Sequence, residues 1–306
     1  MRLLVTGASG LLGLNLSLLA HHAGYDVTGL VHSHALPGAP FDVQQVNLLD
    51  IQKTLQVIAE AKPDVIIHCA AIADLSQAQK NQALTQRINV DASGEIAQAA
   101  YGWGIPMVHI STDAVFDGKQ GGYAEADPPN PLSVYAKSKL AAEHVVSESN
   151  PDALVTRVVF YGWSLSGKRS LSEFFYNNLK DGVPVNGFTD TFFCPLYVED
   201  LGEILLEMLA KKLKGLYHVV SPEFISKFDF GVKIAKRFGF EPGLVKPIKM
   251  ADIKREAPRA LNLSLSADKV QDVLNRQLPS IDDGIDSFYR RWEEGYHQKI
   301  RNIANE

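Results

Sequence analysis

The stretch that decides the fold is Leu3-Leu4-Val5-Thr6-Gly7-Ala8-Ser9-Gly10-Leu11-Leu12-Gly13. It places a short apolar run before three glycines at a three-residue spacing, and a helical pattern follows them. Gly7 permits a tight turn, Gly10 lets the backbone approach a diphosphate, and Gly13 allows close packing of the helix on the strand. The start of the helix offers free N–H groups and a positive dipole end to phosphates. This context predicts a nucleotide-binding turn rather than a plain tight turn.

The residues that follow the second predicted strand indicate which cofactor is expected. An NAD-preferring site usually has a carboxylate about 20 residues beyond the glycines, bound to the ribose 2′-hydroxyl. Here that stretch reads Leu30-Val31-His32-Ser33-His34, without a carboxylate, and its side chains can donate hydrogen bonds to a 2′-phosphate. NADP(H) is therefore favoured and NAD(H) is the alternative cofactor. A solvated loop is an equally good interpretation of these histidines.

The residues expected to bind the dinucleotide lie in the glycine turn and after the strands that follow it. They are Gly7, Ser9, Gly10, Leu11, Leu12, Gly13, His32, Ser33, Asn47, Leu48, Ala70, Ala71 and Ser111, joined by Tyr135 and Lys139.

Strand-like and helical patterns alternate through the first half of the chain. Strands are predicted at Leu3–Val5, Val27–Val31, Val65–Cys69, Val108–Ile110 and Leu154–Val159, and helices at Leu11–His22, Ile51–Ala61, Asn81–Tyr101 and Ser133–Ser149. This alternation predicts an α/β fold, a Rossmann-type doubly wound parallel sheet. Residues 1–162 are expected to form the NAD(P)-binding domain, completed by about residues 189–220. Residues 163–188 and 221–306 are expected to form a smaller C-terminal substrate-binding lobe.

The composition narrows the class of protein. The chain has 306 residues, of which 46% are hydrophobic, and a net charge of -5, which disfavours a nucleic-acid binder. No apolar run approaches the roughly 20 residues that cross a bilayer, so no membrane association is expected. The two cysteines suit a reducing compartment, and the cytoplasm is the expected location. The nine histidines show no metal-site spacing, so no metal is expected.

Tyr135 and Lys139 stand four residues apart and would share one face of a helix. A nearby ammonium is expected to lower the pKa of Tyr135 by about 1–3 units, which would let the phenol exchange a proton with a substrate oxygen. Thr112 follows a buried strand and is expected to hydrogen-bond the reacting carbonyl. Tyr176 and Lys180 have the same spacing, but no strand ending in hydroxyls precedes them, so this second pair is interpreted as a coincidence.

Together these residues resemble the extended short-chain dehydrogenase/reductase family. The resemblance is carried by the Gly7-Gly10-Gly13 turn, Cys69-Ala70-Ala71, Asn89, Ser111-Thr112-Asp113, Tyr135 with Lys139, and Tyr161-Gly162. Within the family the chain looks most similar to dTDP-4-dehydrorhamnose reductase-like proteins, through Val115-Phe116-Asp117-Gly118, Tyr123-x-Glu125 and Ser138–Glu143. The resemblance implies an NAD(P)H-dependent oxidoreductase that reduces a keto-sugar nucleotide, with Thr112, Tyr135 and Lys139 as catalytic residues. A homodimer is also consistent with the resemblance.

Two departures keep other functions open. Ala114 stands where that subfamily usually has Tyr, and the segment 157–162 lacks a usual Trp that touches the sugar. A non-catalytic NADP-binding regulatory subunit, resembling that of methionine adenosyltransferase, is therefore an alternative. A sugar-nucleotide epimerase is another, because it uses the same triad. A dehydratase is disfavoured, since Asp113 lacks a second carboxylate beside it.

The candidate substrate residues are Asp113, Phe160, Lys168 and Arg259. Lys168 and Arg259 are cations that can meet the diphosphate of a sugar nucleotide. A solvated loop is an equally good interpretation of the segment around Lys168.

Overall fold

The computed structural model describes residues 1–253 and 260–304. Its main feature is a seven-stranded sheet with the order β11-β6-β5-β4-β1-β2-β3, in which all neighbouring strands are parallel. The strands are β1 (Arg2–Thr6), β2 (Asp26–Val31), β3 (Asp42–Gln45), β4 (Val65–His68), β5 (Met107–Thr112), β6 (Leu154–Val158) and β11 (Gly215–Val219). The strand order reverses between β1 and β4, and ligands of such sheets bind at this point, beyond the carboxyl ends of the strands.

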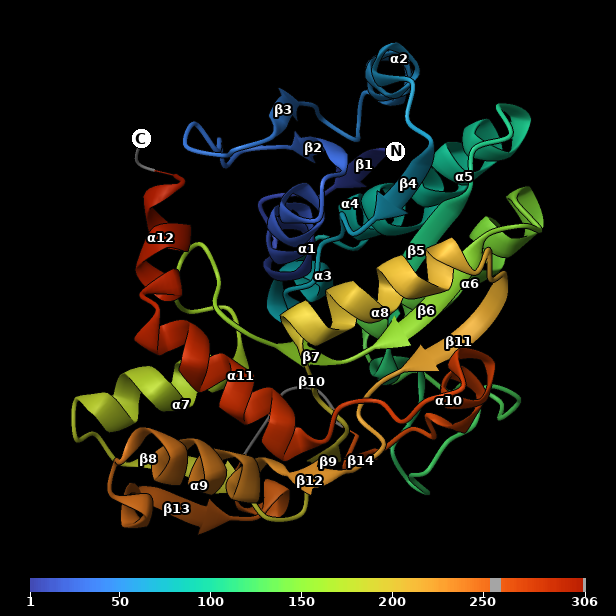
Figure 1. Ribbon diagram of the computed structural model, residues 1–306. Coiled ribbons are helices and arrows are strands. Elements are labelled where there is room, and N and C mark those ends of the chain that lie inside the picture. The colour runs from blue at the N-terminus through green and yellow to red at the C-terminus, as the bar shows by residue number, and fades with distance from the viewer. Residues whose placement is uncertain (254–259, 305–306) are drawn as a thin grey trace.

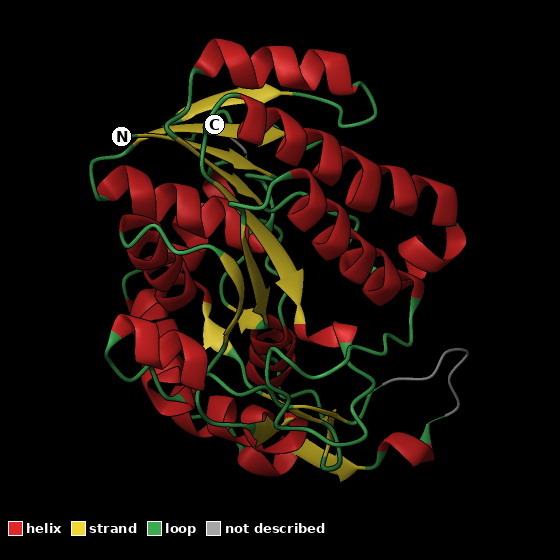
Figure 2. Cartoon of the chain, turned by 90° about the vertical axis from the view of Figure 1, so that its right-hand side faces the viewer, coloured by secondary structure: helices red, strands yellow, loops and turns green. Residues whose placement is uncertain are grey.

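Helices cover both faces of this sheet (Figures 1 and 2). On one face α1 (Leu11–His22) packs against α8 (Val198–Ala210), and on the other α5 (Ala92–Gly102) packs against α6 (Val134–Ser149) and α2 (Ile51–Ala61). Leu3 and Val5 belong to one buried cluster and Leu4 to the other, as expected for a strand buried on both faces. The predicted doubly wound α/β fold is confirmed.

The helix expected over Asn81–Tyr101 is present, but it contains a π-helical turn. The structure divides it into α4 (Gln82–Gln86), a π-helical turn η1 (Arg87–Asp91) and α5, with a separate short helix α3 (Leu75–Lys80) before them. Asn89 lies in the π-helical turn, and its buried amide bonds the backbone of Ile72 and the Ser138 hydroxyl. These hydrogen bonds join residues far apart in the chain, so local periodicity does not predict the π-helical turn. Such turns are frequent at functional sites.

Most of the remaining elements lie in the lower half of Figure 1, with α12 higher up on the left and α10 on the right beside β11. Small sheets pair β7 (Phe160–Tyr161) with β10 (Leu196–Tyr197), β8 (Val185–Phe188) with β13 (Val245–Ile248), and β9 (Phe192–Phe193) with β12 (Ile225–Ser226) and β14 (Asn262–Leu263). The helices here are α7 (Leu171–Lys180), α9 (Lys227–Phe238), α10 (Asp268–Leu274), α11 (Ile281–Glu293) and α12 (Tyr296–Asn302), with short 3-10 turns at η3 (Pro242–Leu244) and η4 (Met250–Asp252).

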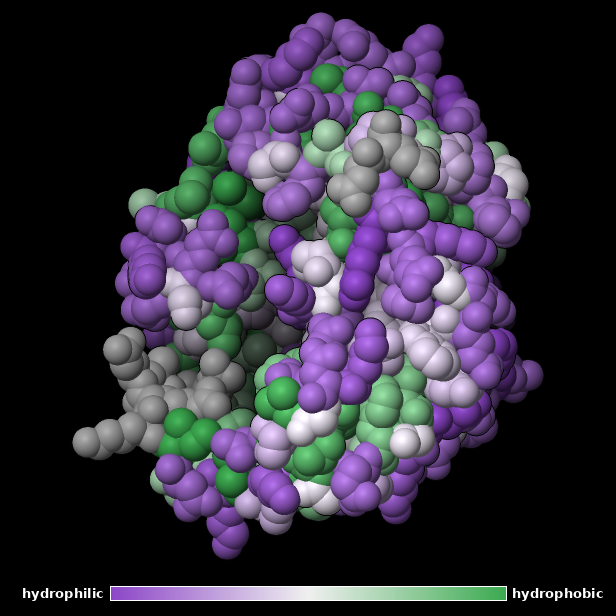
Figure 3. Space-filling view, turned by 90° about the vertical axis from the view of Figure 1, so that its left-hand side faces the viewer, coloured by the Kyte–Doolittle hydropathy of each residue, from purple (hydrophilic) through white to green (hydrophobic). Residues whose placement is uncertain are grey.

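Strand β11 and helix α8 come from the segment 189–220 and complete the large sheet and its cover. Between this upper part and the lower elements the surface is hollowed, as seen from the left-hand side of the molecule (Figure 3). Within the part of the chain that the structure describes, no helix has the length and apolar character needed to cross a membrane.

Candidate active site

The glycine turn between β1 and α1 has the geometry of a phosphate cradle. Gly7 has a φ of +69°, and a Cβ on it would lie 2.8 Å from the backbone of Ala70. A Cβ on Gly13 would lie only 2.3 Å from the Gly7 carbonyl oxygen. Helix α1 begins after Gly10 with no side-chain cap and no acidic residue in its first turn, so its N–H groups face no side-chain acceptor. The turn therefore fits a dinucleotide diphosphate.

The other residues expected at the cofactor lie at the same edge of the sheet. Ser9 and Leu11 are half-buried and Leu12 is buried at the start of α1, while His32 and Ser33 are exposed directly after β2. Asn47 is exposed two residues beyond β3, and Leu48 is buried below it. Ala70 and Ala71 follow β4, and the Ala70 N–H donates to Thr6 Oγ1 at 3.2 Å. The carboxyl ends of four neighbouring strands thus bring these residues to one edge.

The three candidate catalytic residues come from β5 and α6. Thr112 ends β5, and Ser133 caps α6 by accepting a hydrogen bond from the Ala136 N–H, so Tyr135 and Lys139 occupy the first turns of the helix. The Thr112 hydroxyl lies close enough to the Tyr135 phenol to lower its pKa. Thr112 Oγ1 also donates to Asp113 Oδ1 at 3.0 Å, at the start of the 3-10 turn η2 (Asp113–Val115). The structure therefore brings a phenol, a hydroxyl and a carboxyl together at the carboxyl end of β5.

The expected lowering of the Tyr135 pKa is wrong for this structure. Burial raises the pKa of Tyr135 to about 12, the neighbouring Thr112 hydroxyl only partly opposes this rise, and the negative charge of Asp113 adds to it. The Lys139 ammonium bonds to the ring of His109 instead of the phenol. The expectation failed because spacing on a helix shows that two residues share a face but gives neither the direction of a long side chain nor its desolvation.

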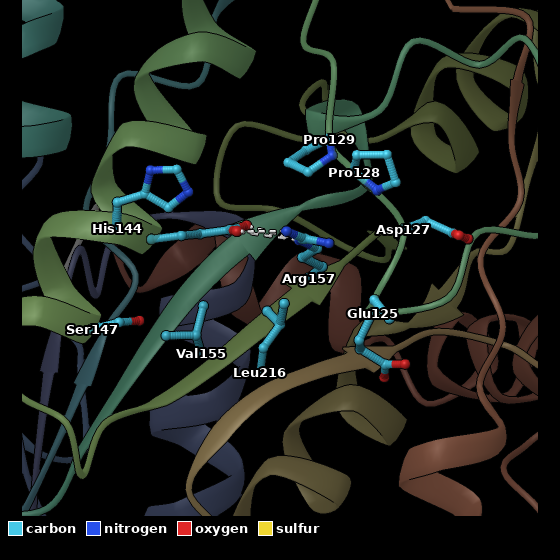
Figure 4. A pocket seen from close by; sticks show the side chains of 11 residues that line it. Glu125, Asp127, Pro128, Pro129, His144, Ser147, Val155, Arg157 and Leu216 are labelled. Atoms are coloured by element: carbon cyan, nitrogen blue, oxygen red, sulfur yellow. Dashed lines mark hydrogen bonds and ion pairs between the residues drawn. The ribbon is translucent and has the colours of Figure 1, made fainter.

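A buried ion pair supports this part of α6. Glu143 lies one helical turn beyond Lys139, and its carboxylate accepts two hydrogen bonds from Arg157 Nε and one at 2.8 Å from Nη2. The Ser111 hydroxyl also donates to Glu143, so it is engaged inside the fold rather than turned to a cofactor. Figure 4 shows Arg157 at a cavity of 260 Å³ beside His144 and Ser147 of α6. This ion pair therefore ties β5, β6 and α6 together behind the catalytic residues.

Of the four candidate substrate residues, the structure places one against the triad. Asp113 is buried, which raises its pKa to about 6, and the positive charge of Lys227 opposes this rise. Phe160 is half-buried on β7 and pairs with β10, whereas Lys168 is exposed on the loop before α7. Arg259 lies outside the described residues. Lys227 comes from the start of α9, so a cation of the lower elements acts on the catalytic end of β5.

The second Tyr–Lys pair lies elsewhere. The Tyr176 hydroxyl accepts a hydrogen bond from Trp292 Nε1 at 2.7 Å, and its ring packs edge-on against Trp163 and Phe238. Lys180 is exposed. Tyr176 therefore belongs to an aromatic core and Lys180 to the surface, which agrees with the interpretation of this pair as a coincidence.

Three residues that contact this site were not singled out as functional from the sequence: His109, Glu143 and Arg157. His109 and Ser111 alternate along β5 and both face α6, where they bond Lys139 and Glu143. The sequence shows that His109 and Ser111 share one face of a strand and that Lys139 and Glu143 share one face of a helix. It does not show that these two faces pack against each other. Among the described residues no cluster of three or more His, Cys, Asp or Glu side chains is arranged to hold a metal.

The chain is similar to several known proteins. The family model of the RmlD substrate binding domain matches residues 1–293. The chain is 33% identical to the probable low-salt glycan biosynthesis reductase Agl14 of Haloferax volcanii, over 92% of this chain and 95% of that protein. It is 30% identical to methionine adenosyltransferase 2 subunit beta of Bos taurus, over 87% and 80% of the two chains.

A solved structure of dTDP-4-dehydrorhamnose reductase from Bacillus anthracis, in complex with NADP, matches with a TM-score of 0.84 and 27% identity. It covers 95% of this chain and 99% of that one. The matched reductases bear out the expected class, an NAD(P)-dependent oxidoreductase of the extended short-chain dehydrogenase/reductase type. The chain therefore belongs to the family of the RmlD substrate binding domain.

Proposed function

We propose that this protein is an NADPH-dependent reductase of a keto-sugar nucleotide, similar to dTDP-4-dehydrorhamnose reductase. The observation that carries the proposal is the proximity of the Tyr135 phenol and the Thr112 hydroxyl at the edge where the phosphate turn lies. NADPH, when bound, supplies the hydride that reduces the carbonyl carbon. The glycine turn would hold its diphosphate, and the absence of a carboxylate after β2 supports NADP over NAD, which is the alternative cofactor.

Tyr135 is proposed as the proton donor. Because its pKa is raised to about 12, the phenol keeps its proton at neutral pH and can give it to the carbonyl oxygen as that oxygen gains negative charge. Thr112 would orient the same oxygen. A protonated phenol suits the reductive direction, since oxidation of an alcohol would need the phenolate.

The test is turnover of NADPH with a 4-keto sugar nucleotide. Tyr135→Phe is expected to lower kcat by about 10²–10⁴-fold, because removal of a general acid typically has this effect. Tyr176→Phe is the matched control, since it removes the hydroxyl of the other Tyr-x-x-x-Lys pair, and it should keep near wild-type activity. A Tyr135→Phe variant with wild-type turnover would contradict the mechanism.

A regulatory subunit is the second candidate, and the 30% identity to methionine adenosyltransferase 2 subunit beta supports it. Tight binding of NADPH with no oxidation across a panel of sugar nucleotides, together with a stable hetero-complex, would favour that function. No observation on this chain favours an epimerase. A homodimer and a cytoplasmic location stay predictions.

A further inference from the structure

Lys139 has an unusual environment for a lysine. Its side chain is only 3% exposed, and its Nζ lies 3.2 Å from Nε2 of His109. No carboxylate lies within ion-pair distance of this ammonium in the described part of the chain. The nearest one along the helix, Glu143, is bonded to Arg157 and Ser111 instead. A buried ammonium without an anion needs a neutral acceptor, and His109 provides one.

His109 is built into the sheet rather than attached loosely. It is fully buried on β5, three residues before Thr112, and its ring stacks on the ring of His68 with centroids 5.6 Å apart. His68 is fixed in turn by Thr6 Oγ1 at 2.7 Å and Ser93 Oγ at 2.9 Å. Burial and the neighbouring positive charge hold the pKa of His109 well below its usual value, so this imidazole is neutral.

We propose that His109 is a positioning residue for Lys139, whose Nε2 holds the lysine nitrogen one helical turn from Tyr135. The inference rests on the proposed function. The hydrogen bond can run in either direction: a charged Lys139 donates to Nε2, and a neutral Lys139 accepts from an Nε2–H. His109 therefore keeps the lysine nitrogen bonded in both protonation states.

The position of the ring proton on His109 depends on the protonation state of Lys139. Nδ1 of His109 has no hydrogen-bond partner among the described residues, so placing the ring proton on Nδ1 leaves a buried donor unsatisfied. When Lys139 is neutral the proton can sit on Nε2 and only an acceptor is left unpaired. This cost only partly offsets the charge-assisted hydrogen bond that a charged Lys139 donates to Nε2, so His109 on balance favours the charged state.

The remaining groups around Lys139 do not replace His109. Burial lowers the pKa of Lys139 to about 8, and Glu143 on α6 and Cys69 after β4 act in the opposite direction. His68 of β4 also lies within electrostatic reach of the lysine. The hydrogen bond from a charged Lys139 to Nε2 is charge-assisted and therefore stronger than the bond to a neutral lysine, so loss of His109 would lower the Lys139 pKa further.

The experiment measures the Lys139 titration directly. Lysine labelled with ¹³C at Cε reports its protonation by NMR, and the Lys139 signal is assigned from its loss in Lys139→Arg. The cofactor-free protein is compared with His109→Leu, which removes the acceptor, and with His109→Gln, whose amide retains both a donor and an acceptor. His218→Leu is the matched control, because His218 is also a fully buried strand histidine but contacts Arg157 at 3.4 Å rather than Lys139.

We expect His109→Leu to lower the Lys139 pKa by about one unit, a tenfold change in its proton dissociation constant, whereas His109→Gln and His218→Leu stay near wild type. The alkaline limb of the reductase pH profile should move by the same amount. His109→Met replaces His109→Leu if the leucine variant does not fold.

An unchanged Lys139 titration in the apolar variant, or an equal shift in His218→Leu, would overturn the proposal and leave His109 a packing residue. This readout needs no substrate. It is therefore separate from the test of reductase activity, which can fail while the Lys139 result stands.

Discussion

Removing Arg157 tests whether the ion pair behind the catalytic residues stabilises the fold. The perturbation is Arg157→Met, which keeps much of the side-chain volume but removes the guanidinium. In the structure the Arg157 and Glu143 side chains are only 3% and 6% exposed. The guanidinium also lies over the ring of Phe116, with its centre 5.0 Å from the ring centroid. The substitution therefore leaves the Glu143 carboxylate buried, with Ser111 as its remaining hydrogen-bond donor.

The expected cost follows from burial rather than from distance. Breaking a buried ion pair by removing one partner typically costs about 3–5 kcal/mol, because the other charge stays desolvated. The pair Lys214–Asp152 is matched in distance, at 2.7 Å against 2.8 Å, but both of its side chains are 56% exposed. Lys214→Met should therefore cost only about 0–1 kcal/mol.

Urea unfolding followed by circular dichroism measures both variants under the same conditions. The double variant Arg157→Met with Glu143→Leu should recover most of the lost stability, since an apolar replacement of a buried pair is often neutral. Two results would refute the reasoning: a loss below about 1 kcal/mol in Arg157→Met, which would match an exposed pair, or a double variant less stable than either single one.

Three further predictions concern the cofactor site and the buried acid. Gly13→Ala should abolish NADPH binding as measured by fluorescence titration, because its Cβ would lie 2.3 Å from the Gly7 carbonyl, whereas Gly102→Ala, with open space around it, should bind normally. Asp113→Asn should stabilise the fold by about 1–3 kcal/mol above pH 6 and by much less near pH 4. The Asp113 pKa of about 6 in the folded protein lies above the ordinary 3.8, so ionisation of this carboxyl destabilises the native state fully only above pH 6. Equal shifts of the urea midpoint at both pH values would contradict this. His32→Asp should weaken NADPH relative to NADH by about tenfold through repulsion of the 2′-phosphate, and an unchanged ratio of the two dissociation constants would place that phosphate elsewhere.

Much of the fold and the location of the site could be predicted from the sequence because the signals are local. The apolar run at Val65–His68 predicts a buried strand, and the spacing of Gly7, Gly10 and Gly13 reflects steric limits at one turn. The sequence also distinguished Tyr135 from Tyr176 as the candidate catalytic tyrosine, since only Tyr135 follows a strand that ends in hydroxyls. These features depend mostly on contacts between residues near each other in the chain, and the close approach of Gly7 to Ala70 is the exception.

What the tertiary structure alone decided is how charges and protons are distributed. The pKa of Tyr135 rises because the folded chain buries its phenol. Lys139 contacts His109 because helix α6 packs against strand β5, which comes from a distant segment of the chain. The π-helical turn at Asn89 likewise exists through hydrogen bonds to Ile72 and Ser138. Side-chain direction and burial are sums over many distant neighbours, so residue spacing identified the catalytic groups but not their ionisation.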